Sequence, residues 1–245
     1  MRKLLTITTF TICILITSCG VLPPKNNFHS TNSSVELGVV GEIQNSIRKT
    51  TFQTFGNPKY NSLIRVSVSK SSFTSKVFKL YEKSLGGKDR LNKIIFNDTL
   101  AVKPTFVTVK IENKVAVVKA LNESNTEVFN YLKKSPRALL VNSLRLIPTQ
   151  DFLDLLEKSD AIYLKTDKQT KQRLLVYKNE KEIGSTDVSK QVIFGYELAS
   201  FCWKTTSRRK IEIATILNED QNCSNTTKRN VEELEKELTK SSFKF

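Results

Sequence analysis

Four carboxylates recur at intervals of three residues in the middle of the chain, at Asp151, Asp154, Glu157 and Asp160. Paired carboxylates can cleave glycosidic bonds when about 5–10 Å separates them in a cleft. The same spacing also results when acids cover the solvated face of an amphipathic helix, and acids in the first turn suit the helix dipole. We interpret the four carboxylates as the exposed face of a short helix, and we keep a carboxylate-based glycan-active enzyme as an alternative function.

Serine and lysine three positions apart could serve as a nucleophile and its base. The chain contains three such pairs: Ser46/Lys49, Ser67/Lys70 and Ser207/Lys210. Such pairs arise by chance in a chain rich in both residues, and on a strand their two members point to opposite faces. We therefore assign them no catalytic role.

Histidine chemistry depends on one residue, because His29 is the only histidine in the chain. It falls in a segment that we expect to be a flexible tether, and a tether cannot position an imidazole as a base or a metal ligand. The sequence also has no phosphate-binding glycine loop and no dinucleotide fingerprint. We therefore expect no metal ion, no cofactor and a function that is not enzymatic.

The first residues have the pattern of an export signal. A short basic start precedes an uncharged apolar segment, residues 4–16, which is shorter than the roughly 20 residues that span a bilayer. The segment leads into an aliphatic residue, two small residues and a cysteine, in the order Ile16-Thr17-Ser18-Cys19-Gly20. This pattern resembles the lipobox of bacterial lipoproteins. The resemblance implies that residues 1–18 are a signal peptide and that Cys19 becomes the lipidated first residue.

An ordinary secretory signal is the alternative, but Ile16 fits it poorly because ordinary cleavage requires small residues at both key positions. Two or more acyl chains, at about 0.8 kcal/mol per buried CH₂, would anchor the protein stably. Gly20 is not the aspartate that retains lipoproteins in the inner membrane of enteric bacteria. We therefore expect a lipid-anchored protein of the bacterial cell envelope, in the outer membrane and facing the periplasm. A cell with one membrane would display it outside.

Two cysteines remain once the signal peptide and the lipid are accounted for. Cys13 leaves with the signal peptide and Cys19 carries the lipid, so Cys202 and Cys223 are left in an oxidising compartment. We predict a disulfide between them, whose loop of about 20 residues would stabilise the fold by about 3 kcal/mol. A buried reduced pair is the alternative. Two cysteines alone lack the further ligands of a metal site.

The chain is strongly basic, with a net charge of +15 that falls by two when Arg2 and Lys3 are removed. Such a charge can attract anionic lipids, lipopolysaccharide, acidic glycans or nucleic acid, although export excludes nucleic acid as a partner. A weak candidate ligand-binding set is Trp203 in an aromatic strand with the basic run at Arg208, Arg209 and Lys210, which we expect at a hairpin tip. The alternative is that Trp203 packs in the core beside the disulfide.

The mature chain divides into a tether and a domain. Residues 19–35 contain two prolines and several polar residues, which is typical of a flexible linker. Residues 36–245 are long enough for a single domain with a sizeable core. Hydrophobic periodicity predicts an α+β fold for this domain, with a mainly antiparallel sheet and several helices.

The early elements follow the order strand–helix–strand–strand–helix–strand, which resembles a ferredoxin-like unit. In this interpretation Ser72 caps the first helix and Gly86 ends it. Asn113 then turns a hairpin between strands at 107–111 and 115–121. The second helix begins at a capping box, Ser124–Glu127. The later elements that we expect are a buried strand at 139–147, a helix from Thr149, strands at 161–166, 171–178, 192–203 and 210–217, and a helix at 228–240.

These features leave three candidate functions. The first is a membrane-anchored envelope lipoprotein that binds or scaffolds another envelope protein without catalysis. The second is a ligand-binding module for anionic lipid, lipopolysaccharide or glycan, which predicts that basic residues gather on one face around a groove. The third is the carboxylate-based glycan-active enzyme, for which the sequence nominates no pair of acids.

Overall fold

The computed structural model describes residues 27–31, 35–45, 50–86, 94–167, 169 and 171–242. The expected signal peptide, Cys19 and residues 20–26 of the expected tether lie outside this range. Among the described residues, no helix has the length and apolar character needed to cross a membrane.

The fold is α+β, as the periodicity predicted. Its strands are β1 (His29–Ser30), β2 (Val40–Asn45), β3 (Thr50–Gly56), β4 (Ile64–Ser72), β5 (Thr105–Ile111), β6 (Leu139–Ile147), β7 (Ala161–Thr166), β8 (Gln172–Lys178), β9 (Lys181–Asp187), β10 (Val192–Thr205) and β11 (Ile211–Asn218). Its helices are α2 (Ser75–Leu85), α3 (Lys114–Ser124), α4 (Thr126–Lys134), α5 (Gln150–Lys158) and α6 (Val231–Ser242), with a short 3₁₀ turn, η1, at Val188–Lys190.

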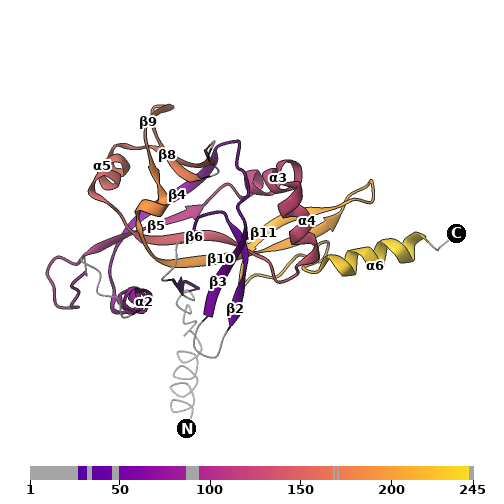
Figure 1. The fold of residues 1–245 in the computed structure, drawn as a ribbon, viewed down its shortest axis with the longest axis horizontal. Helices are drawn as coiled ribbons and strands as arrows, with labels where there is room; N and C mark the ends of the chain where they lie inside the picture. The colour runs from indigo at the N-terminus through magenta and orange to yellow at the C-terminus, as the bar shows by residue number, and fades with distance from the viewer. Residues whose placement is uncertain are drawn as a thin grey trace, which may run out of the picture.

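Every described strand pairing is antiparallel, in the order β1-β10-β6-β5-β4-β7-β8-β9 (Figure 1). The 14-residue β10 organises one half of the sheet, because β6 pairs along one of its edges while β1 and β11 share the other. Register shifts occur at three places in β10, and such bulges bend a strand and increase its twist. The hairpin of β2 and β3 joins the sheet through β6.

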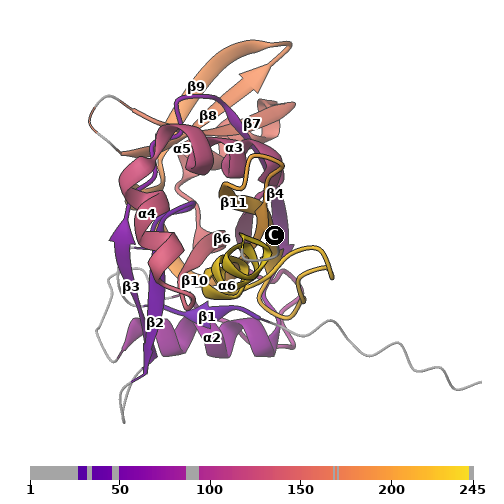
Figure 2. The same ribbon diagram turned by 90° about the vertical axis from the view of Figure 1, so that its right-hand side faces the viewer.

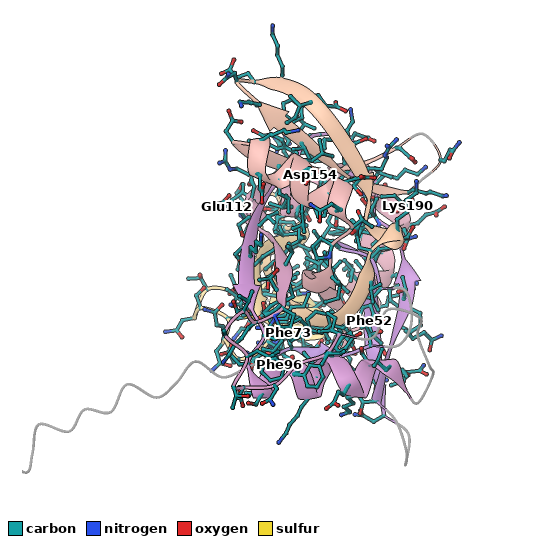
Figure 3. All side chains as sticks on the ribbon, turned by 90° about the vertical axis from the view of Figure 1, so that its left-hand side faces the viewer. Phe52, Phe73, Phe96, Glu112, Asp154 and Lys190 are labelled. Carbon is teal, nitrogen blue, oxygen red and sulfur yellow. A yellow bond between two sulfur atoms is a disulfide. The ribbon has the colours of Figure 1, made fainter. Side chains whose placement is uncertain are left out.

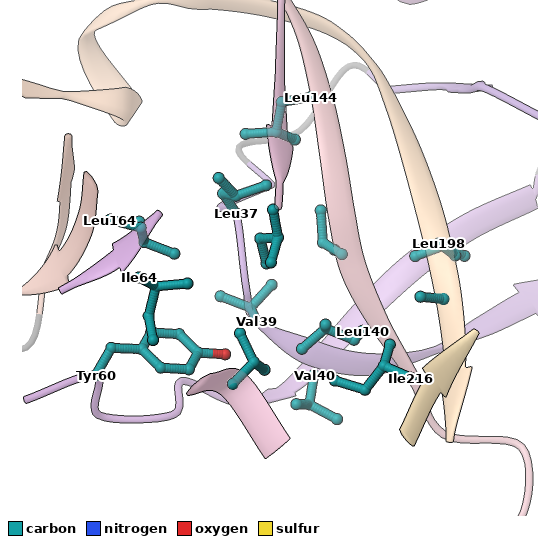
Figure 4. Packing of buried hydrophobic residues seen from close by; sticks show 14 of the residues in the cluster. Leu37, Val39, Val40, Tyr60, Ile64, Leu140, Leu144, Leu164, Leu198 and Ile216 are labelled. Carbon is teal, nitrogen blue, oxygen red and sulfur yellow. The ribbon is translucent and has the colours of Figure 1, made fainter. Parts of the chain in front are cut away.

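The main core lies on the face of the sheet that α3, α4 and α5 help to cover (Figure 4). Tyr60 is fully buried there, and its hydroxyl donates a hydrogen bond to the carbonyl oxygen of Gly38 at 2.6 Å. Burial raises the pKa of Tyr60. Gly38 has a φ of +80°, and a Cβ at this position would lie 2.8 Å from the Tyr60 ring. The turn therefore requires glycine for both its backbone conformation and its packing.

A second, smaller core lies under α2 on the opposite face of the sheet. The Phe73 ring is at its centre and packs against the rings of Tyr81, Phe106 and Phe194. The centroid of the Phe73 ring lies 5.2–5.9 Å from the centroids of these three rings. The predicted end of this helix at Gly86 is confirmed by its left-handed φ of 58°. The predicted cap at Ser72 is wrong: β4 continues through Ser72, and Thr74 caps the helix instead.

The predicted ferredoxin-like order is wrong, because residues 114–124 form α3 rather than a returning strand. The Asn113 side chain accepts a hydrogen bond from the Ala116 N–H and starts the helix. Val117 and Leu121 then point to the core while Val115 is 79% exposed. The order is therefore β-α-β-α-α-β.

The helix α4 is present as predicted, but the capping box at Ser124–Glu127 does not form. Asn125 is its N-cap, and the Asn125 amide instead hydrogen-bonds the backbone of Lys59 and Ala120. This amide ties the β3–β4 connection to the end of α3. The remaining expected strands and helices are confirmed within three residues, and β1, β2, β3 and β9 are additional strands that the sequence interpretation missed.

The prediction of a flexible tether is wrong for residues 28–31, because these residues are docked on the domain. His29 pairs with Tyr196 across β1 and β10, its ring stacks on the Tyr196 ring at 5.4 Å, and its Nε2 lies 3.2 Å from Glu219 Oε2. The Phe28 ring lies 3.7 Å from the Arg145 guanidinium. Contacts to the sheet therefore position His29, and its contacts with Tyr196 and Glu219 help to dock β1 on the domain.

Candidate functional site

The predicted disulfide is present between Cys202 and Cys223, whose Cα atoms lie 5.7 Å apart. Cys202 is fully buried in β10, and Cys223 lies in the segment between β11 and α6. The Trp203 N–H and carbonyl oxygen also pair with Lys228 in that segment. The disulfide therefore fastens the connection to α6 against the sheet.

The weak candidate ligand set does not form one site. Trp203 is only 2% exposed, and its ring packs edge-on against Phe129 at 5.6 Å, so the alternative of a core residue is correct. Arg208, Arg209 and Lys210 lie at the exposed turn between β10 and β11, as predicted for a hairpin tip. A ligand at this tip cannot reach the buried indole, so these four residues cannot act together.

The four spaced carboxylates lie on the exposed surface of α5 and just after it, as the helix-face interpretation predicted. Asp154 accepts a hydrogen bond from the Gln150 side chain, and Asp160 accepts a hydrogen bond from the Asn179 N–H. Glu157 forms an ion pair with Lys70, whose Nζ lies 3.8 Å from Glu157 Oε1. Each of these three acids thus has a structural partner.

The serine–lysine pairs do not form dyads among the described residues. The Ser67 hydroxyl donates a hydrogen bond to the Lys110 carbonyl oxygen, whereas Lys70 forms an ion pair with Glu157 on the other side of β4. Ser207 and Lys210 are exposed in the hairpin turn, and the pair at 46 and 49 lies outside the described residues. Within the described part of the chain, no group of three or more His, Cys, Asp or Glu side chains could hold a metal ion.

A groove of about 490 Å³ lies between β4 and α5. Val66 and Ile162 of the sheet form its apolar floor, and half-buried Val68, Leu153 and Leu156 form its apolar walls. In Figure 3, Glu112 marks its rim and Asp154 lies on the neighbouring helix α5. The spacing of residues in the sequence singled out Ser67, Lys70, Glu157 and Asp160 of this lining, but not its apolar residues and not the groove itself.

The groove runs beside an open edge of β4. The β7 strand pairs with β4 only from Ile64 to Val66, although β4 continues to Ser72. In the described part of the chain no strand pairs with this edge beyond Val66. The open edge therefore begins where the apolar groove lies.

The direction of the backbone groups on this edge follows from the β4–β5 register. The Arg65 carbonyl oxygen accepts a hydrogen bond from the Glu112 N–H, and the Phe73 N–H donates to Pro104, so the odd-numbered residues of β4 bond to β5. Because hydrogen-bonding direction alternates along an antiparallel strand, the N–H and C=O groups of Val68 and Lys70 point toward the groove.

Charged side chains form the rim of the groove. Arg65 Nε lies 3.1 Å from Glu112 Oε2 at one side, and Lys70 Nζ lies 3.8 Å from Glu157 Oε1 across it. All four side chains are at least half exposed, so each pair contributes little to stability and can be rearranged. The groove therefore offers backbone hydrogen-bonding groups, an apolar floor and exposed charges, which suit the binding of an extended chain.

A second cleft of about 460 Å³ lies between α5 and the β8–β9 hairpin. Here Arg173 donates to Ser185 Oγ at 2.6 Å, and Gln191 accepts from the Thr149 N–H at the start of α5. The first contact joins β8 to β9 and the second joins the end of η1 to the start of α5, so the polar groups of this cleft serve the fold.

Two carboxylates near this cleft have opposite pKa shifts. Burial, and the nearby charge of Asp187, raise the pKa of Glu36. Burial also opposes ionisation of Asp187, but hydrogen bonds from Ser189 and the charges of Lys171 and Lys190 outweigh it and lower its pKa. Glu36 is not among the residues that line the cleft, so the two acids do not converge on a common space for a substrate.

No protein-family model and no curated protein matches this chain. The groove at β4 therefore has to be interpreted from its geometry.

Proposed function

We propose that this protein is a lipid-anchored component of the bacterial envelope that binds an extended segment of another envelope protein along β4. The observation that carries the proposal is the open edge at Val68 and Lys70 beside an apolar groove. Addition of a strand to an exposed sheet edge is a recurring mode of peptide recognition, in which main-chain hydrogen bonds give affinity and pockets give specificity.

The geometry sets what the bound segment would look like. Its backbone would pair with the N–H and C=O groups of Val68 and Lys70. Successive side chains of a strand point to opposite faces, so every second residue would lie over the floor at Val66 and Ile162. We therefore expect a segment with apolar residues at alternate positions, whose remaining side chains meet the charged rim.

Two features support the envelope location. The pattern at residues 16–20 resembles a lipobox, and disulfides such as Cys202–Cys223 persist in oxidising compartments such as the periplasm. A lipid at Cys19 would keep the protein on the membrane, where a partner in the same envelope can reach the groove.

Panning a phage library of short random peptides against the mature protein tests the binding mode. We expect enriched peptides with apolar residues at alternate positions. Val68→Pro should abolish their binding, because proline keeps an apolar side chain while removing the N–H that faces the groove. Ser72→Pro is the matched control, since it changes the same edge of β4 outside the groove and should leave binding intact.

A second variant guards against misfolding: Leu156→Lys changes only the helical wall of the groove and should also abolish binding. Circular dichroism establishes that each variant is folded. The proposal would be contradicted if the enriched peptides bound Val68→Pro and Leu156→Lys as tightly as they bind the unmodified protein. It would also be contradicted if the library yielded no enriched peptide.

A further inference from the structure

The strand β1 fixes where the anchored segment joins the domain. Phe28 packs on Arg145 and His29 pairs with Tyr196, so the chain is held on the domain from Phe28 onward. Phe28 is nine residues after Cys19, and nine extended residues span at most about 30 Å. Given the proposed lipid at Cys19, the surface around β1 must lie within that distance of the membrane.

Helix α2 lies directly beside this attachment point. A Cβ at Gly195 of β10 would be 3.0 Å from Leu80 of α2 and 3.6 Å from the carbonyl oxygen of His29, so the three residues are immediate neighbours. Figure 2 shows α2 and β1 side by side at one end of the molecule, with α5, β8 and β9 at the opposite end. The helix therefore belongs to the end of the domain nearest the anchor.

The outer face of α2 is basic. Lys76, Lys79 and Lys83 are exposed and follow one helical face at i, i+3 and i+7, while Val77 and Tyr81 face the core. In the described part of the chain none of these lysines has a carboxylate partner, and Glu82 is the only acid in the helix. The helix thus presents three exposed lysines and a single acid.

We infer that this face of α2 lies on the anionic phospholipid headgroups of the membrane that holds the anchor. The inference rests on the proposed anchor and adds an orientation to it. Lysines near an anionic leaflet favour contact by about fivefold each, or about 100-fold for three. Because α2 and α5 are at opposite ends of the molecule (Figure 2), the α5 wall of the groove then lies at the end of the domain away from the membrane.

Lysine acetylation followed by mass spectrometry tests this orientation in the mature lipidated protein. The protein is reconstituted into vesicles of phosphatidylcholine, with or without phosphatidylglycerol. On the anionic vesicles we expect Lys76, Lys79 and Lys83 to react at least about tenfold more slowly, because most molecules are docked. Lys210 at the hairpin tip should react equally on both. High salt should remove the protection, because it shortens the Debye length to about 3 Å at 1 M.

A pair of matched variants isolates the helix. Lys76→Gln/Lys83→Gln leaves Lys79 as a reporter and should weaken docking by about 25-fold, so Lys79 regains its reactivity. Arg208→Gln/Lys210→Gln removes the same charge at the hairpin tip and should leave Lys79 protected. If Lys79 reacts equally in both variants, the inference is overturned.

The intact mass of the same sample separates the two proposals. A lipidated protein whose α2 lysines react as fast as Lys210 on anionic vesicles would overturn the orientation and leave the anchor standing. A mass without acyl chains would overturn the anchor, and with it the orientation.

Discussion

Lys70 on the open edge of β4 and Glu157 at the end of α5 form an ion pair across the groove, with Nζ 3.8 Å from Oε1. Their side chains are 51% and 70% exposed, so solvent screens the attraction. The ion pair spans the place where an extended segment would bind. Because the ion pair is weak, Lys70 or Glu157 can break it and contact a bound segment instead.

Lys70→Ala should therefore change the free energy of unfolding by less than about 0.5 kcal/mol. Denaturant unfolding of Lys70→Ala, Glu157→Ala and the double variant measures the coupling directly. A coupling energy above about 1 kcal/mol would mean that the pair locks the groove shut.

Proline substitutions on β4 should reveal which side of the strand is open. Val68→Pro removes an N–H that faces the groove and should cost no more than about 1 kcal/mol. Ser69→Pro removes an N–H that bonds to β5 opposite Thr108 and should cost about 2–4 kcal/mol. Denaturant midpoints compare the two. Equal losses would place a bonding partner on the edge that we describe as open.

The disulfide should account for a large share of stability. Its cysteines are 21 residues apart, for which the loop-entropy relation gives about 3 kcal/mol. The Cys202→Ala/Cys223→Ala variant should lose this amount, and its unfolding midpoint should no longer respond to reductant. An unmodified protein whose midpoint is also indifferent to reductant would contradict this expectation.

Gly38→Ala should destabilise the fold by about 2–4 kcal/mol, because the alanine would adopt a φ of +80° and press on the Tyr60 ring. Tyr60→Phe keeps the ring but leaves the Gly38 carbonyl oxygen without its donor, and should cost about 1–2 kcal/mol. Thermal unfolding of both variants tests the order of the two losses. A tolerated alanine would show that the turn is not fixed as described.

Glu36 should make the protein less stable as the pH rises. Its pKa is raised in the folded state, so the folded protein holds a proton that the unfolded chain releases from about pH 4.5 upward. Stability from this group is present below that pH and is lost as the pH rises through the folded pKa. Glu36→Gln should remove this decline and be more stable than the unmodified protein at pH 7. A variant with the same pH profile would refute the assignment.

The sequence predicted most of the fold because its longer elements are strongly patterned. It failed at 114–124, where Val115 and Val117 alternate like a strand although Val117 and Leu121 share one helical face. It also missed β1, the β2–β3 hairpin and β9, an edge strand in which Ile183 is the only large apolar residue and is 38% exposed. The turn before β9 at Asn179 and Glu180, both with positive φ, is the one local signal that could have predicted the β8–β9 hairpin.

The groove could not be predicted from local pattern. It exists because the pairing with β7 ends at Val66 while β4 runs on to Ser72, and because α5 lies over the gap. Both conditions concern how distant segments meet. The disulfide was predictable for the opposite reason, since the expected signal peptide and lipid accounted for Cys13 and Cys19 and left two cysteines to pair.

Amide hydrogen exchange with an enriched peptide tests the central claim most directly. If the peptide adds a strand to β4, exchange at the Val68 and Lys70 amides should slow upon binding, while Ser69, already bonded to β5, should change little. Protection that appears at β9 or at the β10–β11 turn instead, with Val68 and Lys70 unchanged, would contradict the proposed binding groove.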